Sequence, residues 1–543
     1  MSAFPQSPAF DTAQASEVAA EHITIVDSEA ATELCRSDFI DQLIGSYRQL
    51  ERAIMETAQF IKTACAHGVM NYFAEGMRLQ YGHEVRFAIP TDTDAALAAL
   101  RVEFWHRLLV QTQIFEAMPV NKRVEARKQF SGLDCPPFDE STVRPTIENL
   151  LLQRSSFFAE RVDTIFRGLS KTHITNRPEG FSKKLIIAGV FDKFGYTNSY
   201  KAGLISDLRG VVGRLTRRGE PSEYDTRRLL GRLYETKIGT KVRIDGGAFT
   251  LTVYGVGTVH FEVAAEVAAE LNSILAARYP HAIPSKFRTA PKRPGPLSFD
   301  LAMDRLSMEV ISILQSMRFS TPMRGASNVF SRITQDVAKA VEVLESIGGS
   351  VRLGASKTDL FAEFDFDPQG VIEQIVFSGE VPEQASFQFY ATKGEIGKEA
   401  ASRLAAEPGM LCCEPSAGTG DLAALLPKET TLCIEIARVR AKVLDAKGYN
   451  TVNADFLSWA EQNPQAQFDR ILMNPPFSKG RAKAHLCAAS RLLKEDGRLV
   501  AILPASMLNT APLEGIRHDW SEVYSDQFEG TAVSVVILTA SKV

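Results

Sequence analysis

Four short segments, three of them mainly apolar, follow one another between residues 411 and 473, and each runs into a polar residue. The first three reach Glu414, Glu435 and Asp455, and the fourth, residues 468–473, reaches Asn474. Segments of this length and composition are typical of buried strands, and helical patterns lie between them. Strands that alternate with helices predict a mostly parallel, doubly wound α/β sheet that binds its ligand at the carboxyl ends of the strands. The four polar residues are therefore expected at one edge of such a sheet.

A glycine turn follows the first of these segments. Gly418 and Gly420 let the backbone approach a bound nucleoside closely, and Ala423 replaces the third glycine of the dinucleotide fingerprint, which the fingerprint tolerates. Glu435 then ends the second segment, where a carboxylate can bind ribose hydroxyls. The pattern indicates a nucleoside-binding site.

Asn474 begins the sequence Asn-Pro-Pro-Phe. Pro475 and Pro476 fix φ and remove two N–H donors, so the Asn474 side chain and the Pro475 carbonyl are left as acceptors. Such acceptors suit the two hydrogens of a planar exocyclic amine, and Phe477 offers a face on which the attached ring can stack. Binding both hydrogens draws the nitrogen toward tetrahedral geometry and frees its lone pair to attack a methyl group. An ordinary turn is the alternative interpretation, because Asn-Pro is a common turn dipeptide.

Together with residues 389–394, these motifs resemble the S-adenosylmethionine-dependent amino-methyltransferases of DNA, most closely the N6-adenine branch. The resemblance covers residues 386–543 and implies a Rossmann-like class I methyltransferase domain that methylates adenine in double-stranded DNA. It implies a cofactor site in which Tyr390, Thr392 and Lys393 lie by the methionine carboxylate, and Asp455 and Phe456 hold the adenine. The other residues of this implied site are Glu414, Ser416, Gly418, Gly420 and Glu435. It implies that the flipped target base enters a catalytic loop formed by Asn474, Pro475, Pro476 and Phe477.

Other functions stay open at this point. An Asn-Pro-Pro-aromatic loop also suits RNA adenine, the amino group of DNA cytosine or a protein glutamine. A DNA-binding regulator with an inactive methyltransferase domain is a further alternative. The sequence contains no metal-ligand cluster, P-loop, Ser/His/Asp arrangement or nuclease signature, which favours a modification enzyme without its own nuclease.

The whole chain has the composition of a protein with several globular domains. It has 543 residues, of which 45% are hydrophobic and 23% charged, and its net charge of −4 requires any phosphate-binding surface to be a local patch. Seven cysteines without ligand spacing predict reduced thiols in a cytoplasm. The family resemblance implies that this is the cytoplasm of a bacterial or phage-infected cell. No apolar run is long enough to predict a membrane span.

Patterns along the chain predict six parts. Residues 1–35 are expected to be a mobile tail, 36–154 a helical region, 155–284 a helical plus β-hairpin domain, 285–296 a proline-rich linker, 297–385 a connecting α/β segment, and 386–543 the methyltransferase domain. Apolar residues from Ile40 to Ile61 predict a long amphipathic helix, which forms part of a core or, alternatively, a homodimer seam. Helices are expected over 94–118, 143–169 and 301–317, and a strand over 372–377.

Residues 181–263 carry the second functional prediction. A helix ending near residue 194, helices over 201–218 and 225–234, and a β-hairpin have the order of a winged helix-turn-helix. Residues 181–245 contain 14 Lys and Arg against 7 Asp and Glu. We expect a DNA-binding surface, with a solvated helix face as the alternative, on Arg209, Arg214, Arg217, Arg218, Arg227, Arg228 and Arg232. The block also resembles an uncharacterised domain family found beside methyltransferase domains in phage and plasmid proteins.

Overall fold

The computed structural model describes most of the chain after residue 36. The described residues are 37–81, 92–112, 114–169, 180–279, 283–289, 302–320, 325–329, 335–354, 359–387, 392, 394–508, 513, 516–525, 527 and 533–542. The predicted mobile tail, Tyr390, Lys393 and most of the predicted linker lie outside them.

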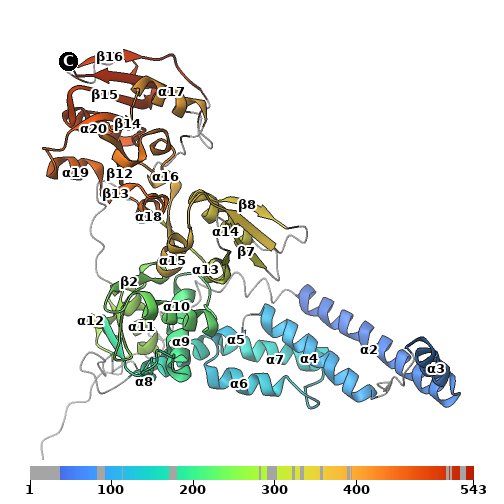
Figure 1. The fold of residues 1–543 in the computed structure, drawn as a ribbon. Helices are drawn as coiled ribbons and strands as arrows, with labels where there is room; N and C mark the ends of the chain where they lie inside the picture. The colour runs from blue at the N-terminus through green and yellow to red at the C-terminus, as the bar shows by residue number, and fades with distance from the viewer. Residues whose placement is uncertain are drawn as a thin grey trace, which may run out of the picture. The chain divides into compact units, whose positions relative to one another are not determined.

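The chain forms two compact units (Figure 1). The first comprises residues 1–187 and 265–291, and the second comprises residues 188–264 and 292–543. This division separates residues 188–264 from the two segments, 155–187 and 265–284, that the sequence analysis joined with them in one domain.

The described part of the first unit is mainly helical. Tyr47 on its longest helix packs against Phe104 and Phe138, with ring centroids 5.5 and 5.3 Å apart. The predicted amphipathic helix is confirmed, and its first turns contribute Ile40 and Ile44 to the core of this unit. Two of the predicted helices, 94–118 and 143–169, are each divided in two. The elements are α2 (Ser37–Ala66), α3 (Val69–Tyr81), α4 (Thr93–Gln111), α5 (Ile114–Ala117), α6 (Val120–Gln129), α7 (Glu140–Leu152), α8 (Arg154–Gly168), β1 (Lys184–Ile187), α11 (Ala265–Arg278) and α12 (Ser285–Arg288).

The second unit begins with two helices and an antiparallel sheet. Asn198 caps the first helix by accepting a hydrogen bond from the Lys201 amide at 3.1 Å. The elements are α9 (Ser199–Leu215), α10 (Glu223–Thr236), β2 (Lys241–Ile244), η1 (Asp245–Gly247), β3 (Phe249–Tyr254) and β4 (Thr258–Val263), and β3 pairs with both β2 and β4.

The predicted helix ending near residue 194 is wrong. The chain instead runs through β1 and a loop in which Gly189 and Gly195 have φ values of 68° and 85°. The Asp192 carboxylate accepts hydrogen bonds from the amides of Phe194 and Tyr196, and these bonds stabilise a turn in place of a helix. The three-helix order of a winged helix-turn-helix is therefore absent from residues 181–236, all of which the structure describes.

The middle of the second unit is a small α/β segment. The sequence predicted helix over 301–317 and strand over 372–377, but the first contains β5 followed by α13 and the second lies in α15. The elements are β5 (Met303–Arg305), α13 (Met308–Ser316), β6 (Arg318–Ser320), β7 (Gly325–Val329), α14 (Gln335–Ser346), β8 (Ser350–Leu353), β9 (Asp359–Glu363), α15 (Gln369–Ser378), β10 (Glu380–Pro382) and α16 (Gln384–Phe387). Its apolar core also contains Val439 and Val443, which come from a helix of the large sheet domain that follows.

A seven-stranded sheet forms the rest of the second unit. Its strand order is β13-β12-β11-β14-β15-β17-β16, with parallel pairing from β13 to β15 and antiparallel pairing of β17 with β15 and β16. The elements are α17 (Glu395–Leu404), β11 (Cys412–Pro415), η2 (Ala423–Leu425), η3 (Lys428–Thr430), β12 (Thr431–Glu435), α18 (Arg438–Lys447), β13 (Asn450–Asn453), α19 (Phe456–Gln462), β14 (Phe468–Met473), η4 (Ser478–Gly480), α20 (Arg481–Arg491), β15 (Leu493–Pro504), η5 (Ala505–Met507), β16 (Arg517–Trp520) and β17 (Val535–Ser541).

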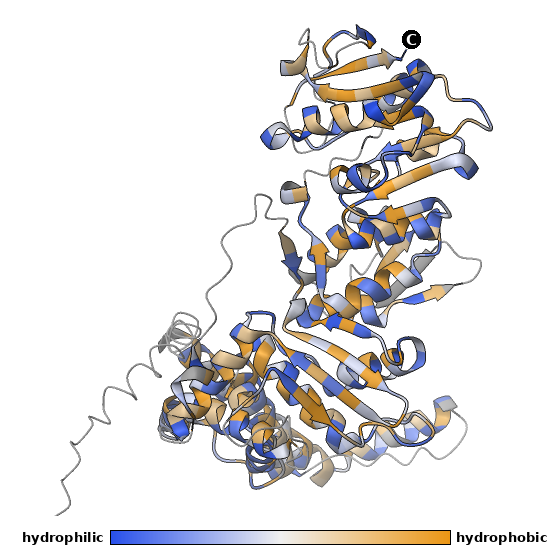
Figure 2. Cartoon of the chain, turned by 90° about the vertical axis from the view of Figure 1, so that its left-hand side faces the viewer, coloured by the Kyte–Doolittle hydropathy of each residue, from blue (hydrophilic) through white to orange (hydrophobic). Residues whose placement is uncertain are grey.

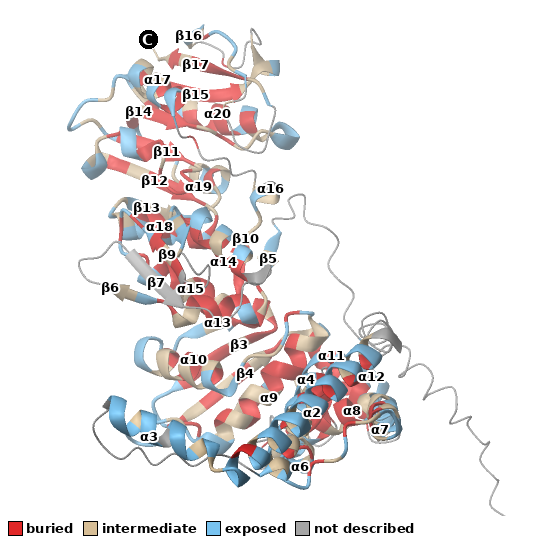
Figure 3. Cartoon of the chain, turned by 90° about the vertical axis from the view of Figure 1, so that its right-hand side faces the viewer, coloured by how far each residue is buried: buried red, intermediate tan, exposed pale blue. Residues whose placement is uncertain are grey.

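The sheet is covered on both faces, which explains the apolar runs of its central strands (Figure 2). Ile471 and Leu499 belong to one apolar cluster, while Leu472 and Val500 belong to another, so neighbouring residues face opposite sides. Strands β11, β14, β15 and β17 are largely buried (Figure 3). The prediction of a mostly parallel, doubly wound α/β sheet is confirmed.

None of the helices in the described ranges has the length and apolar character needed to cross a bilayer.

Candidate active site

The four polar residues that follow the apolar segments come together at one edge of the sheet. Strands β13, β12, β11 and β14 are adjacent and parallel, so their carboxyl ends meet there. Glu414 lies within β11, Glu435 ends β12, Asp455 follows β13 and Asn474 follows β14. The strand order changes direction at β11 and β14, the position where ligands bind in open α/β sheets.

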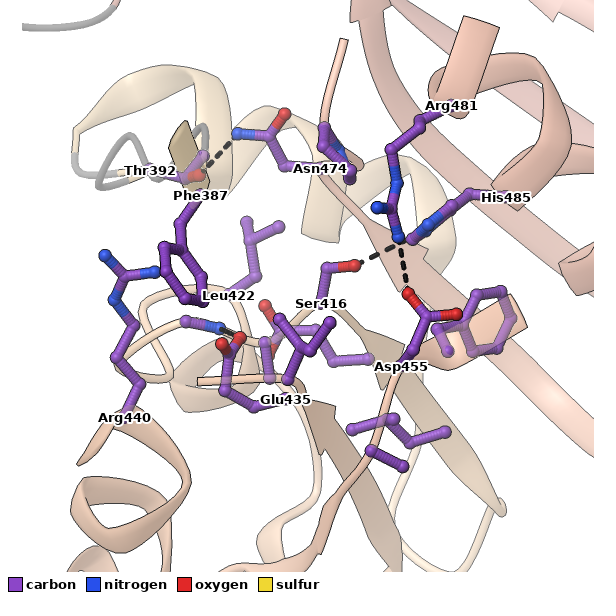
Figure 4. Close-up of a pocket in the computed structure, with 18 of the residues that line it drawn as sticks. Phe387, Thr392, Ser416, Leu422, Glu435, Arg440, Asp455, Asn474, Arg481 and His485 are labelled. Atoms are coloured by element: carbon purple, nitrogen blue, oxygen red, sulfur yellow. Dashed lines mark hydrogen bonds and ion pairs between the residues drawn. The ribbon is translucent and has the colours of Figure 1, made fainter. Parts of the chain in front are cut away.

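These four residues line a cavity of about 240 Å³ (Figure 4). Its wall also includes the glycine turn, the segment before α17 and the start of α20. The lining residues are Ser386, Phe387, Thr392, Glu414, Ser416, Ala417, Gly418, Asp421, Leu422, Ile434, Glu435, Ile436, Arg440, Ala454, Asp455, Phe456, Asn474, Pro476, Ser478, Lys479, Arg481 and His485.

The glycine turn passes close beneath the cavity. Gly418 and Gly420 have φ values of 56° and 90°, and a Cβ on Gly420 would lie 2.8 Å from the Leu444 side chain. Ser416 also has a positive φ, 66°, which is unusual for a residue with a Cβ. The backbone at this turn is therefore held in a conformation that suits glycine, and Ser416, Ala417 and Gly418 line the cavity.

Glu435 is fixed by the amides around it. Its Oε2 accepts a hydrogen bond from Gly418 N and its Oε1 accepts one from Ala437 N, both at 2.8 Å. Burial raises the pKa of Glu435, while Arg440 and the surrounding amides oppose the rise. Each carboxylate oxygen has a second lone pair, so both can still accept a hydrogen bond from a ligand.

Glu414 is a buried carboxyl group with an unused acceptor. Its side chain is 3% exposed, and its Oε2 has no hydrogen-bond partner among the described residues. Burial raises the pKa of Glu414 well above its ordinary value, and the carboxylate of Asp421 adds to the rise, whereas the Ala423 amide opposes it. A cation bound in the cavity would offset both the burial and the repulsion.

Asp455 links the cavity to the loop after Asn474. It caps α19 through Ser458 N at 3.1 Å and accepts a hydrogen bond from Arg481 Nη2 at 2.5 Å. Burial alone would raise the pKa of Asp455, but the Ser458 amide and the Arg481 guanidinium outweigh it and leave the pKa lowered. Phe456 is buried beside the His485 ring, with centroids 5.3 Å apart.

Asn474 is oriented by Thr392. Its Nδ2 donates a hydrogen bond to Thr392 Oγ1 at 2.9 Å, so its Oδ1 is left as the acceptor (Figure 4). Pro476 lines the cavity and Pro475 is buried. Phe477 does not line it but packs, partly buried, against the apolar clusters on both faces of the sheet. The structure thus gives Phe477 a packing role at this edge, and its role as a stacking face for a target base stays a prediction.

Several lining residues that the sequence does not predict as site residues bear on the chemistry of the cavity, among them Arg440, Arg481 and His485. Arg440 lies over the ring of Phe387 at 5.4 Å, and burial lowers its pKa to about 10. His485 Nδ1 is 3.3 Å from Ser416 Oγ, and burial and Arg481 lower the pKa of His485 to about 4. The imidazole is therefore neutral at neutral pH. Arg481 belongs to the short basic stretch Ser478-Lys479-Gly480-Arg481 directly after Phe477, which is a sequence signal that could have found it.

Most of the arginines predicted to bind DNA have acidic or backbone partners. Arg209 is buried and forms two hydrogen bonds with Asp245, at 2.7 and 2.8 Å. Arg218 is also buried and donates to the Leu306 carbonyl at 2.7 Å. The remaining pairs are Arg214 with Glu220, Arg227 with Glu223 and Arg232 with Glu373. These contacts occupy five of the seven arginines, and Arg209 and Arg218 serve the core of the second unit. DNA binding by this group stays a prediction.

Comparisons with known proteins describe two different parts of the chain. Residues 97–281 match the family described as a domain of unknown function, DUF4942. That match ends before the seven-stranded sheet begins. No curated protein matches the chain.

Several solved structures resemble part of the chain. Precorrin-6y C5,15-methyltransferase from Geobacter metallireducens GS-15 is 18% identical over 28% of this chain and 90% of that chain, with a TM-score of 0.23. The 23S rRNA methyltransferase ErmE is 15% identical over 28% of this chain and 70% of that chain, with a TM-score of 0.24. TrmN from Thermus thermophilus is 17% identical over 38% of this chain and 66% of that chain, with a TM-score of 0.22.

Proposed function

We propose that the sheet domain is an S-adenosylmethionine-dependent methyltransferase that acts on the 6-amino group of adenine in DNA. The observation that carries the proposal is the meeting of Glu414, Glu435, Asp455 and Asn474 in one cavity, with Asn474 presenting a fixed acceptor. The Asn-Pro-Pro-Phe sequence and its resemblance to the N6-adenine branch supply the choice of base.

The cavity residues fit the cofactor. Glu435 would accept the ribose hydroxyls, and Asp455 with Phe456 would hold the adenine. The unpartnered Oε2 of buried Glu414 suits the ammonium of the methionine part, because a cation compensates a carboxylate that no protein group neutralises. When bound, S-adenosylmethionine supplies an electrophilic methyl group on a positively charged sulfur.

The protein's part in the reaction is to hold and polarise the target amine. Asn474 Oδ1 and the Pro475 carbonyl would accept its two hydrogens, which shifts the nitrogen toward tetrahedral geometry as the new bond forms. Thr392 keeps the Asn474 amide in the orientation that leaves Oδ1 as an acceptor. Neutral, buried His485 and the Phe456 ring beside it would limit the access of water to their side of the cavity.

One experiment tests the proposal directly. The full chain is incubated with labelled S-adenosylmethionine and, separately, with DNA, RNA and a mixture of proteins, and each product is digested and identified by mass spectrometry. N6-methyladenine in DNA is the expected product. Label found in RNA, in cytosine or in glutamine would identify that group as the substrate in place of DNA adenine. The absence of label from the DNA, the RNA and the proteins would indicate a catalytically inactive domain.

Substituting Thr392 by valine should lower the rate of methyl transfer about tenfold, because the Asn474 amide loses the hydrogen bond that orients it. The cofactor dissociation constant should change less than about twofold, and Thr392→Ser should restore the rate. Both quantities are measured by steady-state kinetics and calorimetry. A large rise in the dissociation constant with an unchanged rate would assign Thr392 to the cofactor site instead.

Substituting Glu414 by glutamine tests the buried carboxyl. The pKa of Glu414 is raised in the folded, ligand-free chain, so above pH 4.5 the folded chain keeps a proton that the unfolded chain releases. The free energy of unfolding therefore falls as the pH rises from 4.5 toward the pKa of the folded state. Ligand-free E414Q should therefore melt at a higher temperature than the wild type at pH 8, and the difference should shrink toward pH 4.5.

The same variant should bind S-adenosylmethionine at least roughly tenfold more weakly, since it cannot compensate the ligand's ammonium. Wild-type binding should release a proton, detectable by calorimetry in buffers of different ionisation enthalpy, and E414Q should not. Equal melting temperatures together with equal affinities would remove Glu414 from the site.

A further inference from the structure

Three aromatic side chains are exposed within seven residues of the second unit. Phe194, Tyr196 and Tyr200 are 72%, 74% and 70% exposed, respectively. Single exposed rings are common on protein surfaces, but a group of this kind marks an interaction site. Neither the proposed methyl transfer nor the cavity uses these rings.

The loop that carries two of these rings is held in a fixed conformation. Asp192 Oδ1 accepts hydrogen bonds from Phe194 N and Tyr196 N, both at 2.9 Å, and Asn198 N donates to the Val190 carbonyl at 2.8 Å. A Cβ on Gly195 would lie 2.7 Å from the ring of Tyr234, so the loop sits directly on α10. The rings are thus presented outward on a preformed backbone, which lowers the entropic cost of binding.

The tip of the β3–β4 hairpin extends this surface. The amides of Val190 and Phe191 donate to the Gly257 carbonyl at 2.8 and 3.3 Å, which holds the hairpin tip against the loop. The tip adds Tyr254, 38% exposed, and Val256, 86% exposed. We call Phe194, Tyr196, Tyr200, Tyr254 and Val256 the aromatic surface.

Two lysine side chains lie close to the exposed rings. Lys193 Nζ lies 5.0 Å from the ring centroid of Phe194, and Lys201 Nζ lies 5.6 Å from that of Tyr200. Asp192 is the one carboxylate among residues 192–201, and its Oδ1 is engaged by the loop amides. Lysine is depleted at protein–protein interfaces, whereas rings interleaved with cations are typical of surfaces that bind single-stranded nucleic acid.

We propose that the aromatic surface binds single-stranded nucleic acid. Unpaired bases stack on Phe194, Tyr196 and Tyr200, and Lys193 and Lys201 neutralise the neighbouring phosphates. Most of the arginines from which the sequence predicts a nucleic-acid surface are paired with acidic side chains or backbone carbonyls. We therefore place the nucleic-acid contact on this loop and the hairpin tip. The binding is separate from methyl transfer and requires neither the cofactor nor the cavity.

The test uses the full chain without cofactor and fluorescently labelled oligo(dT), oligo(rU) and a DNA duplex of equal length. Fluorescence anisotropy should show tighter binding of a single strand than of the duplex, and the preferred strand distinguishes DNA from RNA. Phe194→Ala and Tyr196→Ala should each weaken single-strand binding about tenfold, because one stacking face is lost. Tyr196→Trp should retain binding, whereas Tyr196→Leu, which keeps an apolar side chain but not a flat ring, should lose it.

Tyr224→Ala is the matched control, since Tyr224 is an equally exposed ring, 69%, on α10 of the same unit. It should bind single strands like the wild type, and all variants should keep the wild-type melting temperature. The proposal is overturned if the wild type binds no oligonucleotide or prefers the duplex, or if Tyr196→Leu binds as tightly as the wild type. These outcomes leave the methyl-transfer assay unaffected, so the two proposals fail separately.

Discussion

Replacing Asn474 by alanine is expected to lower the rate of methyl transfer at least about 100-fold while leaving the affinity for S-adenosylmethionine nearly unchanged. In the proposed reaction the Asn474 side-chain oxygen accepts a hydrogen bond from the target amine, and this bond strengthens as the nitrogen becomes tetrahedral. One such acceptor contributes a few kcal/mol to transition-state stabilisation. The amide lies beside Thr392 at the carboxyl end of β14, and no described contact joins it to Glu435 or Asp455. Single-turnover kinetics at saturating cofactor measures the change.

A second variant, Asn474→Asp, separates the acceptor role of the side chain from its hydrogen bond to Thr392. It retains an acceptor for the amine but can no longer donate to Thr392, so its rate should fall between those of the wild type and N474A. Thermal melting should show that both variants remain folded, because Asn474 is only half-buried. A rate for N474A within tenfold of the wild type would exclude the proposed role of this loop.

Replacing Glu435 by alanine is expected to weaken S-adenosylmethionine binding roughly 100-fold, with little effect on the rate at saturating cofactor. Two charge-assisted hydrogen bonds to ribose hydroxyls contribute about 3 kcal/mol, and the carboxylate also holds the amides of Gly418 and Ala437 in place. Isothermal titration calorimetry measures the affinity.

Glu429→Ala provides the control, because Glu429 is an exposed acid a few residues before β12. It changes the net charge of the domain by the same amount and should leave binding unaltered. A strong loss of rate in E435A with unchanged affinity would place Glu435 outside the cofactor site.

The sheet could be predicted because its strands are short apolar runs that end in polar residues. The sequence also indicated the β-hairpin of the second unit, where turn residues and alternation are clear. It failed over 372–377, where Ile372, Ile375 and Val376 are buried in a helix that is apolar on most sides. A short run of this kind has no period that separates a buried helix from a buried strand.

The site was predicted by residue type but not by pairing. Asn474 meets Thr392 across 82 residues, and Arg481 meets Asp455 across 26. Such contacts depend on the folded arrangement of β14, α19 and the segment before α17, which no local pattern specifies. The same limit applies to the arginines of α9, because a count of charges does not show that Arg209 points inward to Asp245.

The shared core between the sheet domain and the segment before it bears on how such a chain can be recombined in evolution. Val439 and Val443 on α18 are almost completely buried in the core of residues 306–381. A gene exchange that transferred residues 394–541 alone would leave both side chains facing water, at a cost of roughly 3–6 kcal/mol, a large part of a domain's usual stability. A fragment that keeps this core intact must therefore be longer than residues 394–541 and start near residue 303, where β5 pairs with β10.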